Sequence, residues 1–265
     1  FFWMPPSVWI LISFLIFIIL NFKNKQKNLV SGICVILMVI LLSSFVKGKK
    51  QTIYSPYQNI SIEQLTTPLN PVIIQTSHLF YQALLNLSEE LTYIQKNKSP
   101  GNIFGYHVDV EHEREFYNIP YLISEDIIEK VLIVGSGAGN DVAAANRFKI
   151  KNITAVEIDP VIADIGKRLH PENPYSNNNV SLVIDDARSF IKNDKIYYDS
   201  IIYGLLDSQT NLSAKGGIRL DSYVFTLEAF KEAKERLTDN GFLCISFFVQ
   251  TPELGFKLFK MLEKT

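Results

Sequence analysis

Three glycines alternate with small residues in the run VLIVGSGAGND, which extends from Val131 to Asp141. The four apolar residues that open the run are typical of a strand covered on both faces. Gly135, Gly137 and Gly139 then allow the backbone to come close to a ligand where a helix begins. The run predicts a site for a nucleotide-like ligand, and a tight turn without a ligand is the alternative.

Acidic residues follow the next two predicted strands. The strand at 153–158 contains Glu157 within VEIDP, where a carboxylate can accept both hydroxyls of a ribose, as in NAD or S-adenosylmethionine. The dinucleotide fingerprint requires a third glycine at position 140, but the residue is Asn140, which favours S-adenosylmethionine. The strand at 180–184 leads to Asp186, which we expect to accept a hydrogen bond from the adenine amino group.

Strand and helix patterns continue to alternate toward the end of the chain. We expect strands at 198–203 and 242–249, a helix at 227–237 between them, and a helix at 253–263. This alternation is typical of an α/β protein with a doubly wound parallel sheet.

The residues from about Tyr54 onward resemble a known family. Five motifs occur in the family's order: SPYQNISI from Ser55, the glycine turn, VEIDP, DDARSF from Asp185, and YDSII from Tyr198. Together they resemble the spermidine synthase-like (aminopropyltransferase) family. The resemblance implies a Rossmann-like sheet of the class I methyltransferase type, preceded by a small N-terminal β region with a hairpin at SPYQNISI.

The resemblance also implies a cofactor site. Gln58, Glu157 and Asp186 would contact the adenosyl ligand, and the three glycines would wrap its tail. Ordinary alternatives are a solvent-facing strand glutamine, a strand-end acid and a helix cap. The complete predicted cofactor-binding set is Gln58, Gly135, Gly137, Gly139, Asp141, Glu157, Asp159, Asp186 and Ala187.

The chain departs from the family at residues that handle amines. Ala138 and Gly204 stand where aminopropyltransferases carry aspartates, and only Tyr81 remains of a Tyr-His-Glu segment. Each lost charge-assisted hydrogen bond costs about 1.5 to 3 kcal/mol. Asp207, which aligns with the second aspartate of the family's D-S-S-D-P stretch, is the predicted catalytic residue.

The segment 204–226 is the predicted acceptor-binding loop, because it follows a strand at the carboxyl edge of the sheet. Ordinary turn and cap roles are the alternative for its polar residues. The predicted acceptor-binding residues, besides Asp207, are Tyr81, Ser208, Gln209, Arg219, Asp221 and Tyr223.

The first fifty residues contain two apolar runs, at 1–20 and 29–46. Each is near the length needed to cross a bilayer, so we expect two transmembrane helices. Lysines flank both ends of the second run, so the positive-inside count is tied. Because S-adenosylmethionine is a cytosolic metabolite, we expect a multi-pass membrane protein whose catalytic domain is cytoplasmic. The predicted domains are 1–50 (membrane hairpin), 51–125 (N-terminal β and helical region) and 126–265 (S-adenosylmethionine-binding domain).

The composition limits the kinds of ligand and partner that the chain is expected to bind. The 265 residues carry a net charge of -1, so charge does not indicate nucleic-acid binding. Cys34 and Cys244 suggest neither a disulfide nor a metal site. The His and acid alternation at 107–115 indicates a solvated strand or hairpin rather than a metal site. With no initiator methionine and with FLCISFFV expected to form a bare sheet edge, we expect a fragment truncated at both ends.

Three functions remain open. The first is a membrane-tethered methyltransferase that uses S-adenosylmethionine, favoured because methyl transfer needs no aspartate to hold an ammonium group. The second is an aminopropyltransferase that uses decarboxylated S-adenosylmethionine, with Asp207 and Asp141 in place of the missing acids. The third is a nucleoside sensor without catalysis. The expected partners are a small-molecule acceptor and the membrane, and a homodimer stays open.

Overall fold

The computed structural model describes residues 4, 6–20, 32, 35, 51–64, 71–76, 79–90, 101–103, 106–108, 110–124, 126–206, 223–247, 249 and 251–265. The chain divides into two compact units, each described by itself. One comprises Phe1–Glu63 with Gln75–His78, and the other comprises Gln64–Ile74 with Leu79–Thr265.

The first unit contains a helix and a hairpin. Helix α1 is Pro6–Leu20, and strands β1 (Gln51–Tyr54) and β2 (Asn59–Gln64) pair antiparallel. Ser55 closes the turn between them, since its backbone N–H donates to the Gln58 carbonyl at 2.9 Å and its Oγ accepts from the Gln58 N–H at 3.0 Å. This is the hairpin expected at SPYQNISI.

The membrane prediction is not supported. Helix α1 has 15 residues, fewer than the roughly 20 that a bilayer requires. Across the described ranges, no helix is both long enough and apolar enough to span a membrane. This finding contradicts the two predicted transmembrane helices and the multi-pass location inferred from them. The second apolar run lies, except for Gly32 and Val35, outside the described residues.

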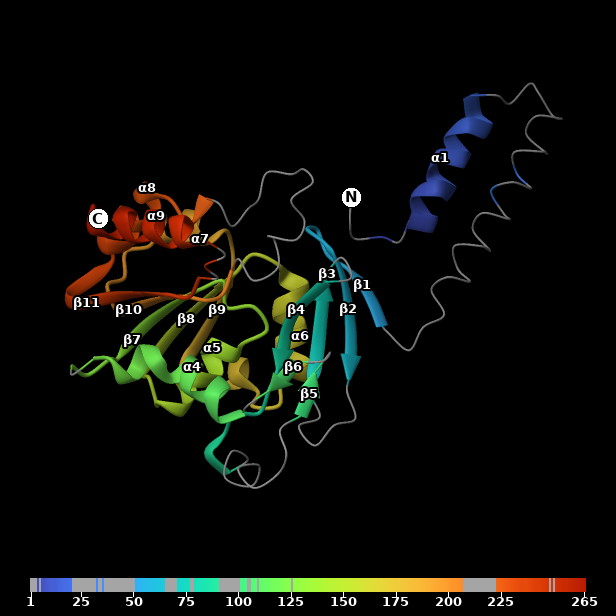
Figure 1. Ribbon diagram of the computed structural model, residues 1–265. Coiled ribbons are helices and arrows are strands. Elements are labelled where there is room, and N and C mark those ends of the chain that lie inside the picture. The colour runs from blue at the N-terminus through green and yellow to red at the C-terminus, as the bar shows by residue number, and fades with distance from the viewer. Residues whose placement is uncertain are drawn as a thin grey trace. The chain divides into compact units, whose positions relative to one another are not determined.

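The other elements follow in chain order, and Figure 1 labels them. They are β3 (Val72–Thr76), β4 (Leu79–Leu84), β5 (Gly101–Ile103), β6 (Tyr106–Val108), α4 (Val110–Leu122), β7 (Lys130–Val134), α5 (Asn140–Arg147), β8 (Asn152–Glu157), α6 (Pro160–Leu169), the 3-10 turn η1 (Pro174–Ser176), β9 (Val180–Ile184), α7 (Ala187–Asn193), β10 (Tyr198–Tyr203), α8 (Leu227–Lys234), β11 (Leu237–Ile245) and α9 (Pro252–Glu263).

A five-stranded parallel sheet organises the second unit. Its order is β11-β10-β7-β8-β9, and every neighbouring pair is parallel. Helices cover both faces, which confirms the predicted doubly wound α/β fold (Figure 1). The four apolar residues of β7 are fully buried because this strand lies in the middle of the sheet.

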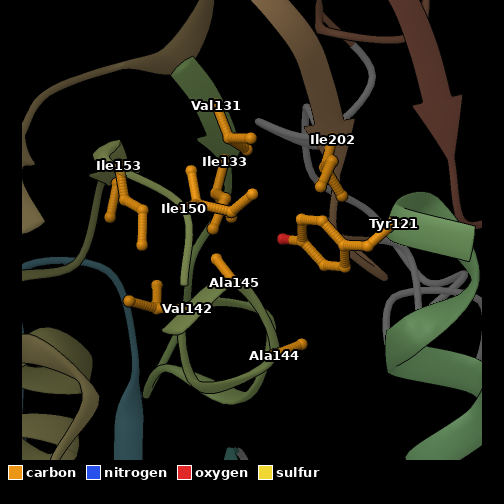
Figure 2. Close-up of a cluster of buried hydrophobic side chains, with 10 residues drawn as sticks. Tyr121, Val131, Ile133, Val142, Ala144, Ala145, Ile150, Ile153 and Ile202 are labelled. Atoms are coloured by element: carbon orange, nitrogen blue, oxygen red, sulfur yellow. The ribbon is translucent and has the colours of Figure 1, made fainter. Parts of the chain in front are cut away.

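Two hydrophobic clusters bind the helices to the sheet. On one face, α4 and α5 pack against β7, with Tyr121, Val142 and Ile133 among the buried residues (Figure 2). On the other face, α7, α8 and α9 pack against β10 and β7, around Phe230 and Tyr203. The central strand is thus fixed from both sides, and the turn that follows it has a rigid base.

Two predicted elements differ in the structure. Strand β11 begins earlier than expected because Leu237 already pairs with Tyr198, and residues 238–241 are accommodated by an irregularity in the pairing. The segment 107–115, expected to be a solvated strand or hairpin, is mostly helical, because only His107 and Val108 belong to β6 and residues 110–115 form the start of α4. Glu111 and Glu113 lie in the first turn of α4, where acidic side chains stabilise a helix.

Candidate functional site

The glycine turn follows β7 at the carboxyl edge of the sheet. Gly135, Gly137 and Gly139 have φ values of 68°, 56° and 107°, in the left-handed region that favours glycine. A Cβ on Gly135 would lie 1.7 Å from Cδ2 of Leu206, so the turn also has no room for a side chain there. Gly139 is the N-cap of α5. The backbone thus forms a cradle at a helix N-terminus, as predicted.

Glu157 supports this cradle from the end of β8. Its Oε2 accepts from the Gly137 N–H at 2.8 Å, and its Oε1 accepts from the Asp159 N–H at 2.9 Å. A carboxylate can accept about four hydrogen bonds, so each oxygen keeps a lone pair for a ribose hydroxyl. The residues present therefore fit an adenosyl ligand.

Burial changes the acidity of Glu157. Loss of solvent is the main cause that raises the pKa of this carboxyl; the backbone N–H donors lower it and the nearby charge of Asp159 raises it, and the net value is about 7. The protonated form is the poorer acceptor, because one oxygen then carries a hydrogen and the negative charge that strengthens each hydrogen bond is lost. We therefore expect the ribose to be held best above about pH 7.

Asn140 takes the place of the third glycine of the dinucleotide fingerprint. Its Nδ2 donates to the Ala83 carbonyl and to the Tyr117 hydroxyl, both at 2.9 Å, and its Oδ1 lies 3.0 Å from Nε2 of His170. The side chain therefore connects β4, α4 and the residue after α6 to the glycine turn. This structural role explains why the position is not glycine.

His170 is expected to make the protein sensitive to acid. Burial lowers the pKa of this imidazole to about 3, whereas the unfolded chain takes up the proton near pH 6.5. The unfolded state thus binds more protons between these values, and stability is lost as the pH falls through this window, by up to about 1.4 kcal/mol per pH unit. Glu157 and Asp141, with their raised pKa values, act in the opposite direction, between about pH 7 and 4.5 and between about pH 6 and 3.8.

The measurement is urea unfolding of the full chain at pH 7, 6 and 5. His170→Gln should be less stable at pH 7 but should lose less stability on acidification. His112→Gln, which changes an exposed histidine on α4, is the matched control and should keep the wild-type slope. Equal slopes for the wild type and His170→Gln would contradict the assignment.

The structure shows capping or packing roles for three other predicted cofactor residues. Their contacts with the cofactor stay predictions. Asp159 is the N-cap of α6 and accepts from the Val161 N–H at 2.9 Å. Asp186 is the N-cap of α7, with Oδ1 accepting from the Ser189 N–H at 2.8 Å. Ala187, the first residue of α7, packs half-buried against the core.

Two residues that the sequence analysis did not predict hold the glycine turn. The Gln82 Oε1 accepts from the Ala138 N–H at 3.0 Å, and the Tyr175 hydroxyl donates to the Gly137 carbonyl at 2.7 Å. The position of Gln82 directly after Tyr81 was the available signal. Burial raises the pKa of Tyr81, and the nearby charges of Glu157 and Asp159 raise it further.

The structure does not place the remaining predicted residues at the glycine turn. Gln58 belongs to the first unit, so its predicted contact with the ligand stays a prediction. Tyr223 is 48% exposed just before α8. The other predicted acceptor and catalytic residues lie outside the described residues: Asp207, Ser208, Gln209, Arg219 and Asp221.

Comparison with protein families finds one match. The family described as "Spermine/spermidine synthase domain" matches residues 113–265, more than half of the chain. This segment includes the glycine turn and all five strands of the parallel sheet.

Individual proteins are similar as well. The polyamine aminopropyltransferase of Buchnera aphidicola subsp. Acyrthosiphon pisum (strain Tuc7) is 32% identical over 157 residues, which cover 57% of this chain and 49% of that protein. The polyamine aminopropyltransferase of Sulfurisphaera tokodaii is 36% identical over 108 residues, which cover 39% of this chain and 34% of that protein. The chain thus spans about half or less of the length of these relatives.

A solved structure shares the fold. The crystal structure of a spermidine synthase in complex with the transition state analogue AdoDATO superposes with a TM-score of 0.54 at 17% identity, and covers 81% of this chain and 63% of that chain. At this identity the likeness supports the α/β fold of class I methyltransferase type and nothing further.

These relatives correct the favoured function. The prediction of membrane-tethered methyl transfer is wrong, because the matching family is described as a spermine/spermidine synthase domain and the relatives are named polyamine aminopropyltransferases. The prediction took Ala138 and Gly204, which replace two aspartates, as evidence against aminopropyl transfer. The family match nevertheless includes both positions. A membrane-anchored subgroup is not shown either.

Proposed function

Because the chain belongs to the spermine/spermidine synthase domain family, we propose that it transfers an aminopropyl group from decarboxylated S-adenosylmethionine to a small amine. The family match over residues 113–265 is the observation that carries this proposal. Decarboxylated S-adenosylmethionine is the donor substrate, and it supplies a reactive sulfonium carbon. The activity of the whole protein is part of the proposal, since the chain spans only part of its relatives.

The residues divide the work as follows. Glu157 accepts from the ribose hydroxyls with the lone pairs that Gly137 and Asp159 leave free. Gly135, Gly137 and Gly139 give the turn its left-handed backbone, and this backbone would contact the tail of the donor. Asp186 keeps its second oxygen for the adenine amino group while the first caps α7. Alignment of the donor and the amine, with water excluded, supplies most of the rate.

A nucleoside sensor without catalysis is the second candidate. One observation favours it: Ala138 and Gly204 provide no carboxylate for an amine. Such a domain would bind the nucleoside and release no product.

The test is the formation of methylthioadenosine by the full chain. We expect product with decarboxylated S-adenosylmethionine and a diamine such as putrescine, and none when S-adenosylmethionine replaces the donor. If the chain bound methylthioadenosine but formed no product with any amine in a panel, the result would support the sensor instead. Release of S-adenosylhomocysteine from S-adenosylmethionine would contradict the proposal.

A further inference from the structure

A carboxylate lies at the topological switch point of the sheet. Strand β7 lies between β8 and β10. The chain adds β8 and β9 on one side of β7, and it then returns to add β10 and β11 on the other side. In open α/β sheets, ligands bind in the crevice at the carboxyl ends of such strands. A Cβ placed on Gly204, directly after β10, would lie 3.2 Å from Oδ2 of Asp141 and 3.0 Å from the Gly135 carbonyl oxygen. Asp141 therefore reaches the ends of both β7 and β10.

The surroundings of Asp141 are suited to a proton acceptor. It lies in the first turn of α5, where the helix dipole favours a negative charge, and it is half-buried. Burial raises the pKa of this carboxyl to about 6, while its own backbone N–H and the charge of Arg147 lower it. It is therefore ionised at neutral pH. The titratable and charged groups that face it from α4, α5, η1 and β11 are Tyr117, Tyr121, Arg147, Tyr175 and Cys244.

We infer that the Asp141 carboxylate binds the attacking amine of the acceptor and takes up its proton, an inference that rests on the proposed aminopropyl transfer. The acceptor ammonium gives one proton to Asp141, and the free amine nitrogen uses its lone pair to bond to the aminopropyl carbon that is attached to sulfur. The carbon–sulfur bond breaks and its electron pair stays on sulfur. The positive charge moves from the sulfonium to the new secondary ammonium, and Asp141 passes its proton to water.

The geometry also explains why position 204 carries no acid. An aspartate there would begin 3.2 Å from Oδ2 of Asp141, so two carboxylates would share one small space. Two such groups cannot both be ionised without a large cost, and one of them would stay protonated. Gly204 leaves this space to the single carboxylate of Asp141. The departure at Gly204 and the presence of Asp141 are thus two parts of one arrangement.

The test compares Asp141→Asn with the full wild-type chain. The amide keeps the shape of the side chain and cannot take up the proton, so kcat/KM for the amine should fall at least about 100-fold. Affinity for methylthioadenosine should stay within about threefold, since the ribose contact is made by Glu157. With the donor at saturation, the acidic limb of the wild-type kcat/KM profile for the amine, near pH 6, should disappear in the variant, whereas the weaker donor binding below about pH 7 that Glu157 causes should remain. Asp164→Asn, an exposed change on α6, is the matched control and should behave as the wild type.

The outcomes separate this inference from the proposed function. A wild type that binds methylthioadenosine but turns over no amine overturns the proposed function, and the role of Asp141 with it. If the wild type is active and Asp141→Asn keeps both the wild-type kcat/KM and the acidic limb of its pH profile, only the role of Asp141 is overturned. A variant that loses donor affinity in proportion to activity also overturns it, because Asp141 would then serve the donor.

Discussion

Glu157→Gln is expected to weaken the binding of methylthioadenosine at least about 100-fold. Two hydrogen bonds from ribose hydroxyls to a charged acceptor contribute about 1.5 kcal/mol each at the low end, and their combined loss corresponds to this factor. The new amide would also point its NH₂ group at a backbone N–H, that of Gly137 or of Asp159. An unpaired buried donor costs a further 1 to 3 kcal/mol or so of folding stability.

Calorimetric titration measures the affinity, and thermal unfolding with and without the ligand measures the stability. Glu115→Gln, a matched change at an exposed position of α4 beyond its first turn, should leave both unchanged. The wild-type affinity should fall as the pH drops below about 7, because the pKa of Glu157 is raised to that value. The Gln variant should lack this pH dependence. Equal affinities for the wild type and Glu157→Gln would remove the ribose assignment.

Local patterns were sufficient to predict the sheet. Strands β7, β9 and β10 lie where their apolar runs end at glycine or acidic residues, because a strand buried on both faces leaves a continuous hydrophobic signal. The glycine turn was also predictable, since glycine adopts left-handed φ values more readily than other residues. These features depend on neighbours in the sequence.

The roles of Asn140, Gln82 and Asp141 could not be predicted in the same way. Asn140 bonds to Ala83, which is 57 positions away, and Gln82 bonds to Ala138 across 56 positions. No local pattern records such partners, because tertiary packing brings them together. The proximity of Asp141 to Gly204 has the same origin.

The membrane prediction failed for another reason. Hydropathy counts apolar residues in a run, whereas spanning a bilayer requires an unbroken helix of sufficient length. Among the described residues, no helix meets both the length and the hydropathy that spanning requires.

Gly166→Ala is expected to destabilise the protein, although the same change in most helices stabilises it. Alanine in a helix interior is normally better than glycine by about 0.5 to 1 kcal/mol. Gly166 lies inside α6, but a Cβ there would lie 2.4 Å from the Ala138 carbonyl oxygen and 2.8 Å from its Cα. Both are backbone atoms of the glycine turn, so no side-chain rotation can relieve the overlap, and α6 or the turn must move.

The expected cost is about 1 to 3 kcal/mol of unfolding free energy, typical of overpacking in a buried contact. A displaced Ala138 also disturbs the adjoining Gly137 N–H that Glu157 binds, so methylthioadenosine should stabilise the variant less than the wild type. Urea unfolding with and without this ligand measures both effects. Gly255→Ala in α9 is the control, because its Cβ would meet only side-chain atoms of Val249, which can adjust. If Gly166→Ala proved as stable as the wild type and bound the ligand equally well, the close approach of α6 to the glycine turn would be disproved.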